Sequence, residues 1–96
     1  MFGVVNRLTF REPIDDELVA RFDIAMVRIR ESACRWAHVV QTGEREVHLV
    51  ILFDSEEQAA EVTEKVGSPL MRELIVPLLD GPTDRRTGPV IASTAG

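Results

Sequence analysis

Asn6 is the side chain whose type and position most call for a chemical explanation. It lies in a segment of period-two alternation and shares one face with Phe2, Val4, Leu8 and Phe10. A buried amide without hydrogen-bond partners costs on the order of 1–3 kcal/mol. Two explanations stay open: the protein bonds the Asn6 amide internally, or the amide orients a bound ligand.

His38, His48 and Trp36 are the other side chains that could take part in chemistry. A histidine can act as a general base near neutral pH, and His38 is the weaker catalytic candidate beside Asn6. The two histidines lack an obvious third ligand, so no metal site is expected. Trp36 is expected to anchor an interface or line a cavity. Cys34 has only Arg35 as a basic neighbour and is expected to be a spectator.

The composition excludes several classes of function. The net charge of −5 argues against nucleic acid as a partner, because phosphate binding needs a clustered positive surface. The longest apolar run, 49–53, is too short to cross a bilayer, so no membrane partner is expected. No secretory signal is recognised, and a single cysteine fits a cytoplasmic location. Phosphate-loop, nucleophile-elbow and zinc-protease motifs are missing, and no cofactor is expected.

The elements that must position these side chains follow the order β-α-β-β-α-β. Alternation and helical spacing predict a strand at 2–11, a helix at 15–32, strands at 35–41 and 46–53, a helical region at 55–79, and a short strand at 90–92. The polar residues 84–86 are expected to form a solvated loop. One domain, 1–96, is predicted, with 93–96 as a loose tail.

Specific residues mark the ends of these elements and set the hairpin register. Asp15 is the predicted N-cap of the first helix, and Ser55 opens the second through a capping box. Gly67 is expected to stop that helix, with Ser68 capping a new one. The hydrophobic pattern favours Val39 opposite Leu49, which makes one face of the hairpin wholly apolar.

The economical packing is a ferredoxin-like α+β fold, with both helices on one face of a four-stranded antiparallel sheet. The open face then exposes apolar side chains, which is a liability on a monomer. A homodimer formed through this face would cover them and build a barrel. The expected interface residues are Arg7, Trp36, His38, His48, Val50 and Leu52.

Four segments carry a family resemblance: residues 5–10, 39–42, 53–57 and 68–71. With this element order, the sequence resembles the dimeric α+β barrel superfamily and, within it, the antibiotic-biosynthesis-monooxygenase-like proteins. The resemblance covers roughly residues 2–92. It implies a homodimer and a cavity between sheet and helices that takes a flat, hydrophobic organic molecule. The expected cavity walls are Phe2, Val4, Leu8, Phe22, Leu70 and Leu74.

Some members of this family oxidise polyketide or quinol substrates with molecular oxygen and neither metal nor flavin. Others bind and degrade haem through an asparagine on the first strand and a tryptophan and a histidine on the second helix. Asn6 matches that asparagine, but residues 56–79 hold neither tryptophan nor histidine, so haem degradation is disfavoured.

Two functions from different classes stay open. The first is a cofactor-independent monooxygenase that acts on an aromatic or quinone-like substrate oriented by Asn6. The second is a non-catalytic ligand-binding or assembly dimer that keeps the fold without the chemistry. The absence of tyrosine, which several family members use, favours the second.

Overall fold

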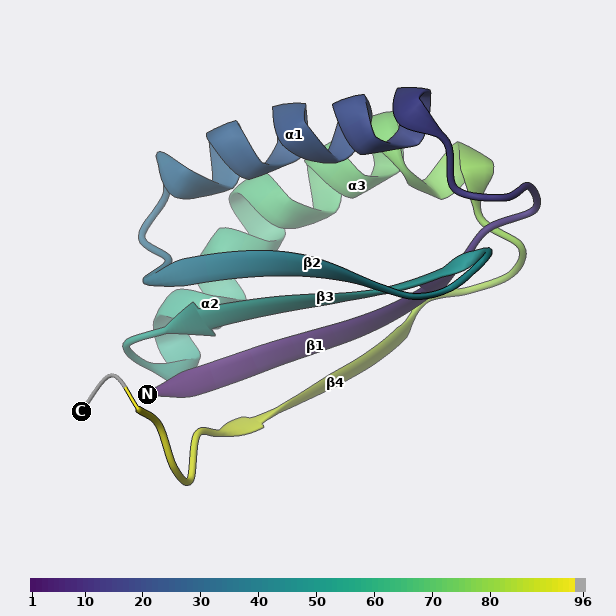
Figure 1. Ribbon diagram of the computed structural model, residues 1–96. Helices are drawn as coiled ribbons and strands as arrows, with labels where there is room; N and C mark the ends of the chain where they lie inside the picture. Colours follow the sequence, from purple (N-terminus) through teal and green to yellow (C-terminus); the bar gives the residue numbers. More distant parts are fainter. Residues whose placement is uncertain (95–96) are drawn as a thin grey trace.

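The computed structural model describes residues 1–94 and confirms the β-α-β-β-α-β order (Figure 1). Helices cover one face of a four-stranded sheet, as the ferredoxin-like prediction requires. The elements are β1 Phe2–Thr9, α1 Asp16–Arg30, β2 Trp36–Gly43, β3 Glu46–Phe53, α2 Glu56–Val62, a π-helical turn Thr63–Gly67, α3 Ser68–Leu74, a 3-10 turn Val76–Leu78 and β4 Asp84–Pro89.

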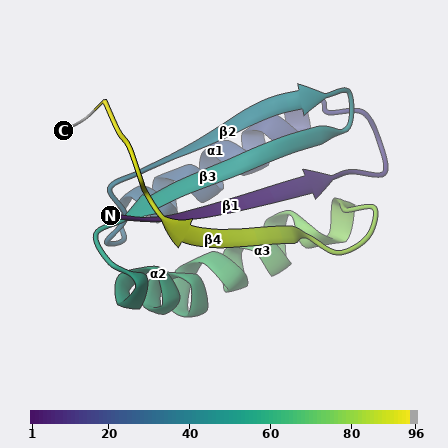
Figure 2. The ribbon, with the colours of Figure 1, turned by 90° about the horizontal axis from the view of Figure 1, so that it is seen from below.

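The strands lie in the order β2-β3-β1-β4, and every neighbouring pair is antiparallel. Figure 2 looks onto the open face of this sheet, with the helices behind it. The predicted hairpin register is confirmed, since Val39 pairs with Leu49. A bulge between Gln41 and Gly43 interrupts the pairing beside the turn.

Two of the three predicted helix caps, Asp15 and Ser55, are confirmed. The third is wrong: Ser68 has helical backbone angles, and no side-chain hydrogen bond in the described part of the chain caps α3. Oδ1 of Asp15 accepts a hydrogen bond from the backbone N–H of Leu18 at 2.9 Å, and the Ser55 hydroxyl accepts one from Gln58 at 3.2 Å. Each cap satisfies a backbone donor that has no partner within its helix. The caps therefore fix where α1 and α2 begin.

The predicted stop at Gly67 is wrong. Gly67 and Ser68 both have helical backbone angles, and the N–H of Ser68 bonds back to the carbonyl of Thr63. This wider i→i+5 spacing makes a π-helical turn. Pro69 follows this turn and has no N–H for the i→i−4 hydrogen bond of a regular α-helix. The wider turn allows the helix to continue through this position. The second helical region therefore bends without ending.

The predicted last strand at 90–92 is also wrong: β4 comprises Asp84–Pro89. It pairs only with β1, at the edge of the sheet, and the N–H of Val90 bonds the carbonyl of Met1 beyond its end. Charged side chains are typical of an edge strand, because they discourage pairing with another chain. The segment 84–86 is therefore strand and not loop.

The core lies between the sheet and the helices as two clusters. One includes Val4, Ile51 and Phe53, and the other is built around Leu8 and Phe10. The side chains that pack against both are Val39, Met71 and Leu74. Within residues 1–94, no helix is both long and apolar enough to span a membrane. Residues 93 and 94 have no helix or strand, and the rest of the predicted tail lies outside the described residues.

Candidate functional site

A cavity of about 300 Å³ lies between the helix-covered face of the sheet and the helices, and Asn6 is part of its wall. Strands β1, β3 and β4 form its floor, while α1, the π-helical turn and α3 enclose it. Figure 2 shows the α2–α3 region running along β4. A volume of this size is at the lower end for small-molecule sites.

Three of the six predicted wall residues line this cavity: Val4, Phe22 and Leu70. Leu8 does not, because it lies two residues beyond Asn6 and is fully buried in the second core cluster. Phe2 and Leu74 pack against the core instead of bounding the cavity. The other apolar wall residues are Ala25, Met26, Ile29, Leu49, Ile51, Met71 and Val76.

The Asn6 side chain is half-buried and has no hydrogen-bond partner among residues 1–94. Its neighbours across the sheet are Leu49 on β3 and Arg85 on β4. Directly paired residues of adjacent strands project to the same face, so Asn6 lies between an apolar and a cationic neighbour. Internal bonding of the amide, one of the two explanations left open by the sequence, has no contact to support it.

Arg85 gives the cavity a cationic rim that the sequence interpretation missed. Its guanidinium donates a hydrogen bond to the hydroxyl of Thr63, in the π-helical turn, at 3.3 Å. Arg72, on α3, also lines the cavity. Reading 84–88 as a strand paired with β1 would have placed Arg85 beside Asn6. The charged neighbours Asp84 and Arg86 made this segment look like a solvated loop.

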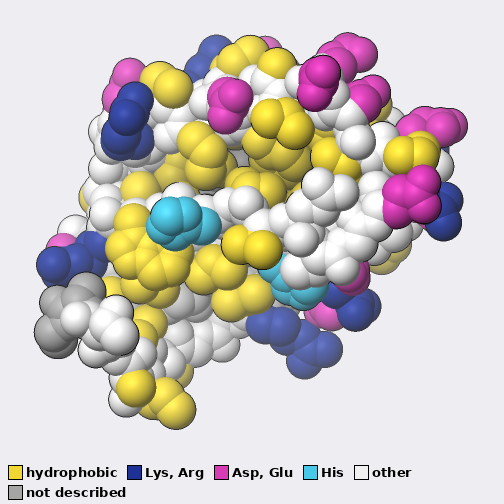
Figure 3. Space-filling view, viewed as in Figure 1, with side chains coloured by type: hydrophobic (Ala, Val, Ile, Leu, Met, Phe, Trp, Pro, Cys, Tyr) yellow, Lys and Arg dark blue, Asp and Glu magenta, His cyan; other side chains and the backbone are white. Residues whose placement is uncertain are grey.

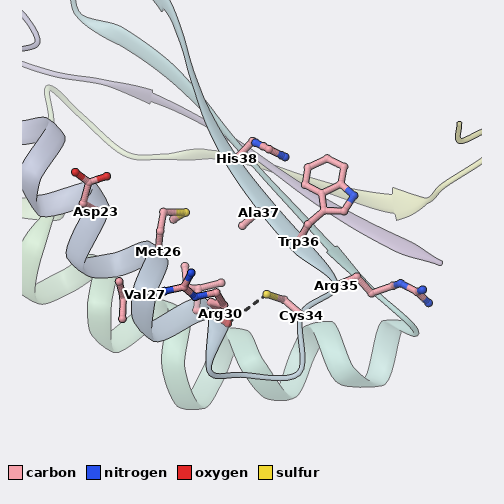
Figure 4. A pocket seen from close by; sticks show the side chains of 10 residues that line it. Asp23, Met26, Val27, Arg30, Cys34, Arg35, Trp36, Ala37 and His38 are labelled. Atoms are coloured by element: carbon pink, nitrogen blue, oxygen red, sulfur yellow. Dashed lines mark hydrogen bonds between the residues drawn. The ribbon is translucent and has the colours of Figure 1, made fainter. Parts of the chain in front are cut away.

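A second, larger hollow of about 640 Å³ lies between α1 and β2 (Figures 3 and 4). Figure 3 shows apolar side chains gathered around it. In Figure 4, Met26 and Ala37 face this space, while Trp36 and His38 project from the opposite face of β2. Their rings are in edge contact, with centroids 4.6 Å apart. His38 therefore lies away from the Asn6 cavity and cannot serve as a base there.

Cys34 also borders this hollow, and its thiol donates a hydrogen bond to the carbonyl of Ile29 at 3.2 Å (Figure 4). Among the described residues, no group of three or more histidine, cysteine, aspartate or glutamate side chains is placed to hold a metal ion. Elsewhere, Glu61 on α2 accepts a hydrogen bond from Lys65 in the π-helical turn at 2.9 Å. This contact raises the pKa of Lys65.

The open face of the sheet divides into a polar end and an apolar end. At the polar end, Arg7 forms ion pairs with Glu46 at 3.7 Å and Asp84 at 3.6 Å, and Thr42 bonds Nδ1 of His48 at 2.9 Å. Both histidines belong to this face, as the register requires. These pairs are exposed, so each contributes little to stability by itself.

Towards the other end, Val5 and Trp36 are 38% and 40% exposed, and Val40, which pairs with His48, is 51% exposed. Val50 is half-buried between them in the register. Leu52 faces the same side but is only 7% exposed, because Gly3 across the sheet leaves it room and Val90 lies beside that glycine. Leu52 is therefore already covered within one protomer.

Of the comparisons with known proteins, the one with solved structures supports the fold. No family model matches the sequence, and no curated protein matches it either. Among solved structures, Rv0793 from Mycobacterium tuberculosis superposes with a TM-score of 0.74 at 19% identity, over 97% of both chains. SnoaB, a cofactor-independent oxygenase from Streptomyces nogalater, superposes with a TM-score of 0.80 at 8% identity, over 99% of this chain and 97% of SnoaB.

A candidate antibiotic biosynthesis monooxygenase from Caulobacter crescentus superposes with a TM-score of 0.78 at 14% identity, over 95% of this chain and 90% of that one. The resemblance to monooxygenase-like proteins expected from the sequence is therefore confirmed for the fold. Identities this low do not carry an activity from one chain to another.

Proposed function

We propose that this protein is a homodimeric, cofactor-independent monooxygenase that acts on an aromatic or quinone-like substrate bound beside Asn6. The observation that carries the proposal is the cavity itself. Its walls are mostly apolar, and the Asn6 amide in the wall is left without a protein partner. Ligand sites combine apolar walls with a few polar groups that fix orientation, and this cavity has that composition.

The amide supplies what a flat aromatic substrate needs. Its N–H groups can donate to a ring carbonyl or phenolate oxygen, and its own oxygen can accept from a phenol. The apolar walls exclude water, which strengthens such a bond. Asn6 would then hold the ring in one orientation while molecular oxygen reacts with it.

The overall reaction needs no added reductant. In the oxidation of an anthrone, a ring CH₂ becomes C=O, one oxygen atom of O₂ enters the ring and the other leaves as water. The substrate supplies all four electrons. The proton lost first goes to solvent, because none of the described residues that line the cavity is a histidine, tyrosine, aspartate or glutamate.

The homodimer would form through the open face of the sheet. Val5, Trp36 and Val40 form an apolar area there that a monomer would leave in water. The polar end, with Arg7 and His48, would fix the relative orientation of the two protomers. A chain of 96 residues also has a small core, so association would add stability that the protomer lacks.

A non-catalytic ligand-binding dimer is the second candidate. The absence of a proton acceptor from the described cavity wall favours it, because the usual cofactor-free oxidation begins with loss of a proton. Both candidates require a ligand in the cavity and differ only in whether oxygen is consumed.

Oxygen uptake with dithranol, an anthrone, tests the proposal. The protein should raise the rate above that of spontaneous oxidation, and labelled O₂ should place one labelled atom in the quinone product. Asn6→Ala should lower the rate by about tenfold or more, since an orienting hydrogen bond is lost. Thr9→Ala, an exposed position on the same strand, is the matched control. Binding of dithranol without any increase in oxygen uptake would favour the ligand-binding dimer.

A further inference from the structure

We infer that the ligand of the Asn6 cavity carries a permanent negative charge, as a carboxylate attached to its apolar ring, and that Arg72 and Arg85 recognise this charge. The inference rests on the proposed function for the site and deepens it by naming the substrate class. The Asn6 amide accounts for an orienting contact, but it does not account for two arginines at one apolar cavity.

The charge of the cavity is opposite to that of the protein. The chain carries a net charge of −5, yet the described cavity wall contains two arginines and no acidic residue. A cavity lined by one sign of charge, with apolar walls, raises the local concentration of ligands of the opposite sign. An acidic protein that concentrates positive charge at one small-molecule cavity therefore favours an anion there.

Neither arginine is neutralised by the protein. Within residues 1–94, no carboxylate forms an ion pair with Arg72 or Arg85. The nearest acidic residues in the sequence have other partners: Glu73 lies 4.0 Å from Arg28, and Asp84 pairs with Arg7 and Arg86. The two guanidinium groups keep their donors for a ligand.

One hydrogen bond restrains Arg85. Among residues 1–94, its guanidinium donates to the neutral hydroxyl of Thr63, which does not offset its charge. Thr63 belongs to the π-helical turn that carries the helix past Pro69. A planar guanidinium is suited to two parallel hydrogen bonds with a carboxylate. The hydrogen bond from Arg85 to Thr63 thus links the bend in the helix to the proposed anion site.

β4 provides a matched control. Arg85 and Arg86 are adjacent, so they project to opposite faces of the sheet. Arg85 lines the cavity, whereas Arg86 pairs with Asp84 on the open side at 3.1 Å. Arg86→Gln removes the same charge from the same exposed edge strand without touching the cavity.

The test compares 2-naphthoate with its neutral analogue 2-naphthamide, with affinities measured by isothermal titration calorimetry. The intact protein should bind the acid about tenfold more tightly than the amide. Arg85→Gln and Arg72→Gln should each reduce this preference, and the double variant should abolish it. Arg86→Gln should keep it. Raising the salt concentration should weaken binding of the acid and leave the amide unaffected.

Circular dichroism checks that each variant is folded. Arg85→Lys keeps the charge but loses the planar guanidinium, so it should retain part of the preference for the acid. Equal affinity for acid and amide would overturn the anion site while leaving the proposed function standing. A preference that survives in the double variant would place the charge recognition elsewhere and overturn the inference. Failure of both compounds to bind would overturn the proposed function as well.

Discussion

The Asn6 amide lies on the core side of β1, between residues that are almost wholly buried. Val4 and Leu8, two residues to either side, are 2% and 0% exposed. The fold tolerates the amide because the cavity leaves it half-exposed, so water can satisfy it in the absence of a ligand. A polar group kept at such a position without a protein partner is better explained by what binds it than by stability.

This account predicts that Asn6→Leu does not weaken the fold. No hydrogen bond within the protein is lost, and apolar area is gained, so the free energy of unfolding should stay unchanged or rise by up to about 1 kcal/mol. Urea denaturation measures the change. Leu8→Ala, in the filled part of the same face, should cost about 2–5 kcal/mol. A loss of more than about 2 kcal/mol in Asn6→Leu would mean that the amide is bonded within the protein.

At the scale of elements, the cavity exists because β4 and the bent α2–α3 region lie side by side. Figure 2 shows this helical region displaced towards the β4 edge of the sheet. The π-helical turn brings Thr63 to Arg85, and the short strand brings Arg85 to Asn6. Two local departures from regular structure, the π-helical turn and the charged edge strand β4, thus meet at the candidate site.

The N-cap of α1 gives a direct test of the local account. Asp15→Ala removes the acceptor for the Leu18 N–H and should lower the free energy of unfolding by about 1 kcal/mol. Asp23→Ala removes an exposed carboxylate from the middle of the same helix and should change it by less than about 0.5 kcal/mol. Equal effects in thermal or urea unfolding would show that the cap does not fix the start of the helix.

The turn into β4 depends on Gly81. Its φ of +100° is open to glycine and strained for other residues, so Gly81→Ala should cost about 1 kcal/mol or more. Gly88→Ala, within β4, meets nothing within 4 Å and has no such backbone angle, so its effect on the same denaturation curve should be small. If both substitutions were neutral, the turn would not be what places β4.

The sequence predicted those elements whose hydrophobic pattern has one consistent solution. A one-residue slip of the β2–β3 hairpin would mix its two faces, so Val39 could only be placed opposite Leu49. β4 had no such pattern, because an edge strand with charged side chains buries little. Gly67 was misread because helix continuation there depends on a wider turn, which local propensity does not reveal. Asn6 was found from its apolar neighbours, whereas Arg85 lay in the misassigned segment.

At the scale of the whole molecule, one side of the sheet is covered by helices and the other is open. Two layers are enough to bury the core, but they leave the apolar end of the open face in contact with water. The second protomer proposed above would add the missing layer. The cavity and the open face lie on opposite sides of the sheet, so association and ligand binding can be tested separately.

Sedimentation of the protein at micromolar concentration should show a dimer. Val40→Lys places a charge on the open face, where Val40 lies opposite His48 and is 51% exposed, and should shift the equilibrium to monomer. Val27→Lys, at a position on α1 that is 45% exposed, should leave the dimer intact. A monomeric wild-type protein would contradict the proposed assembly.

The central claim is that an aromatic molecule binds beside Asn6 and not in the larger hollow along β2. The most direct measurement is a map of chemical-shift changes in isotope-labelled protein titrated with 2-naphthol. The account predicts changes at the side-chain amide of Asn6 and at Thr63 and Arg85, with the signals of Trp36 and His38 unchanged. Changes gathered at Trp36 and His38, or none at all, would contradict it.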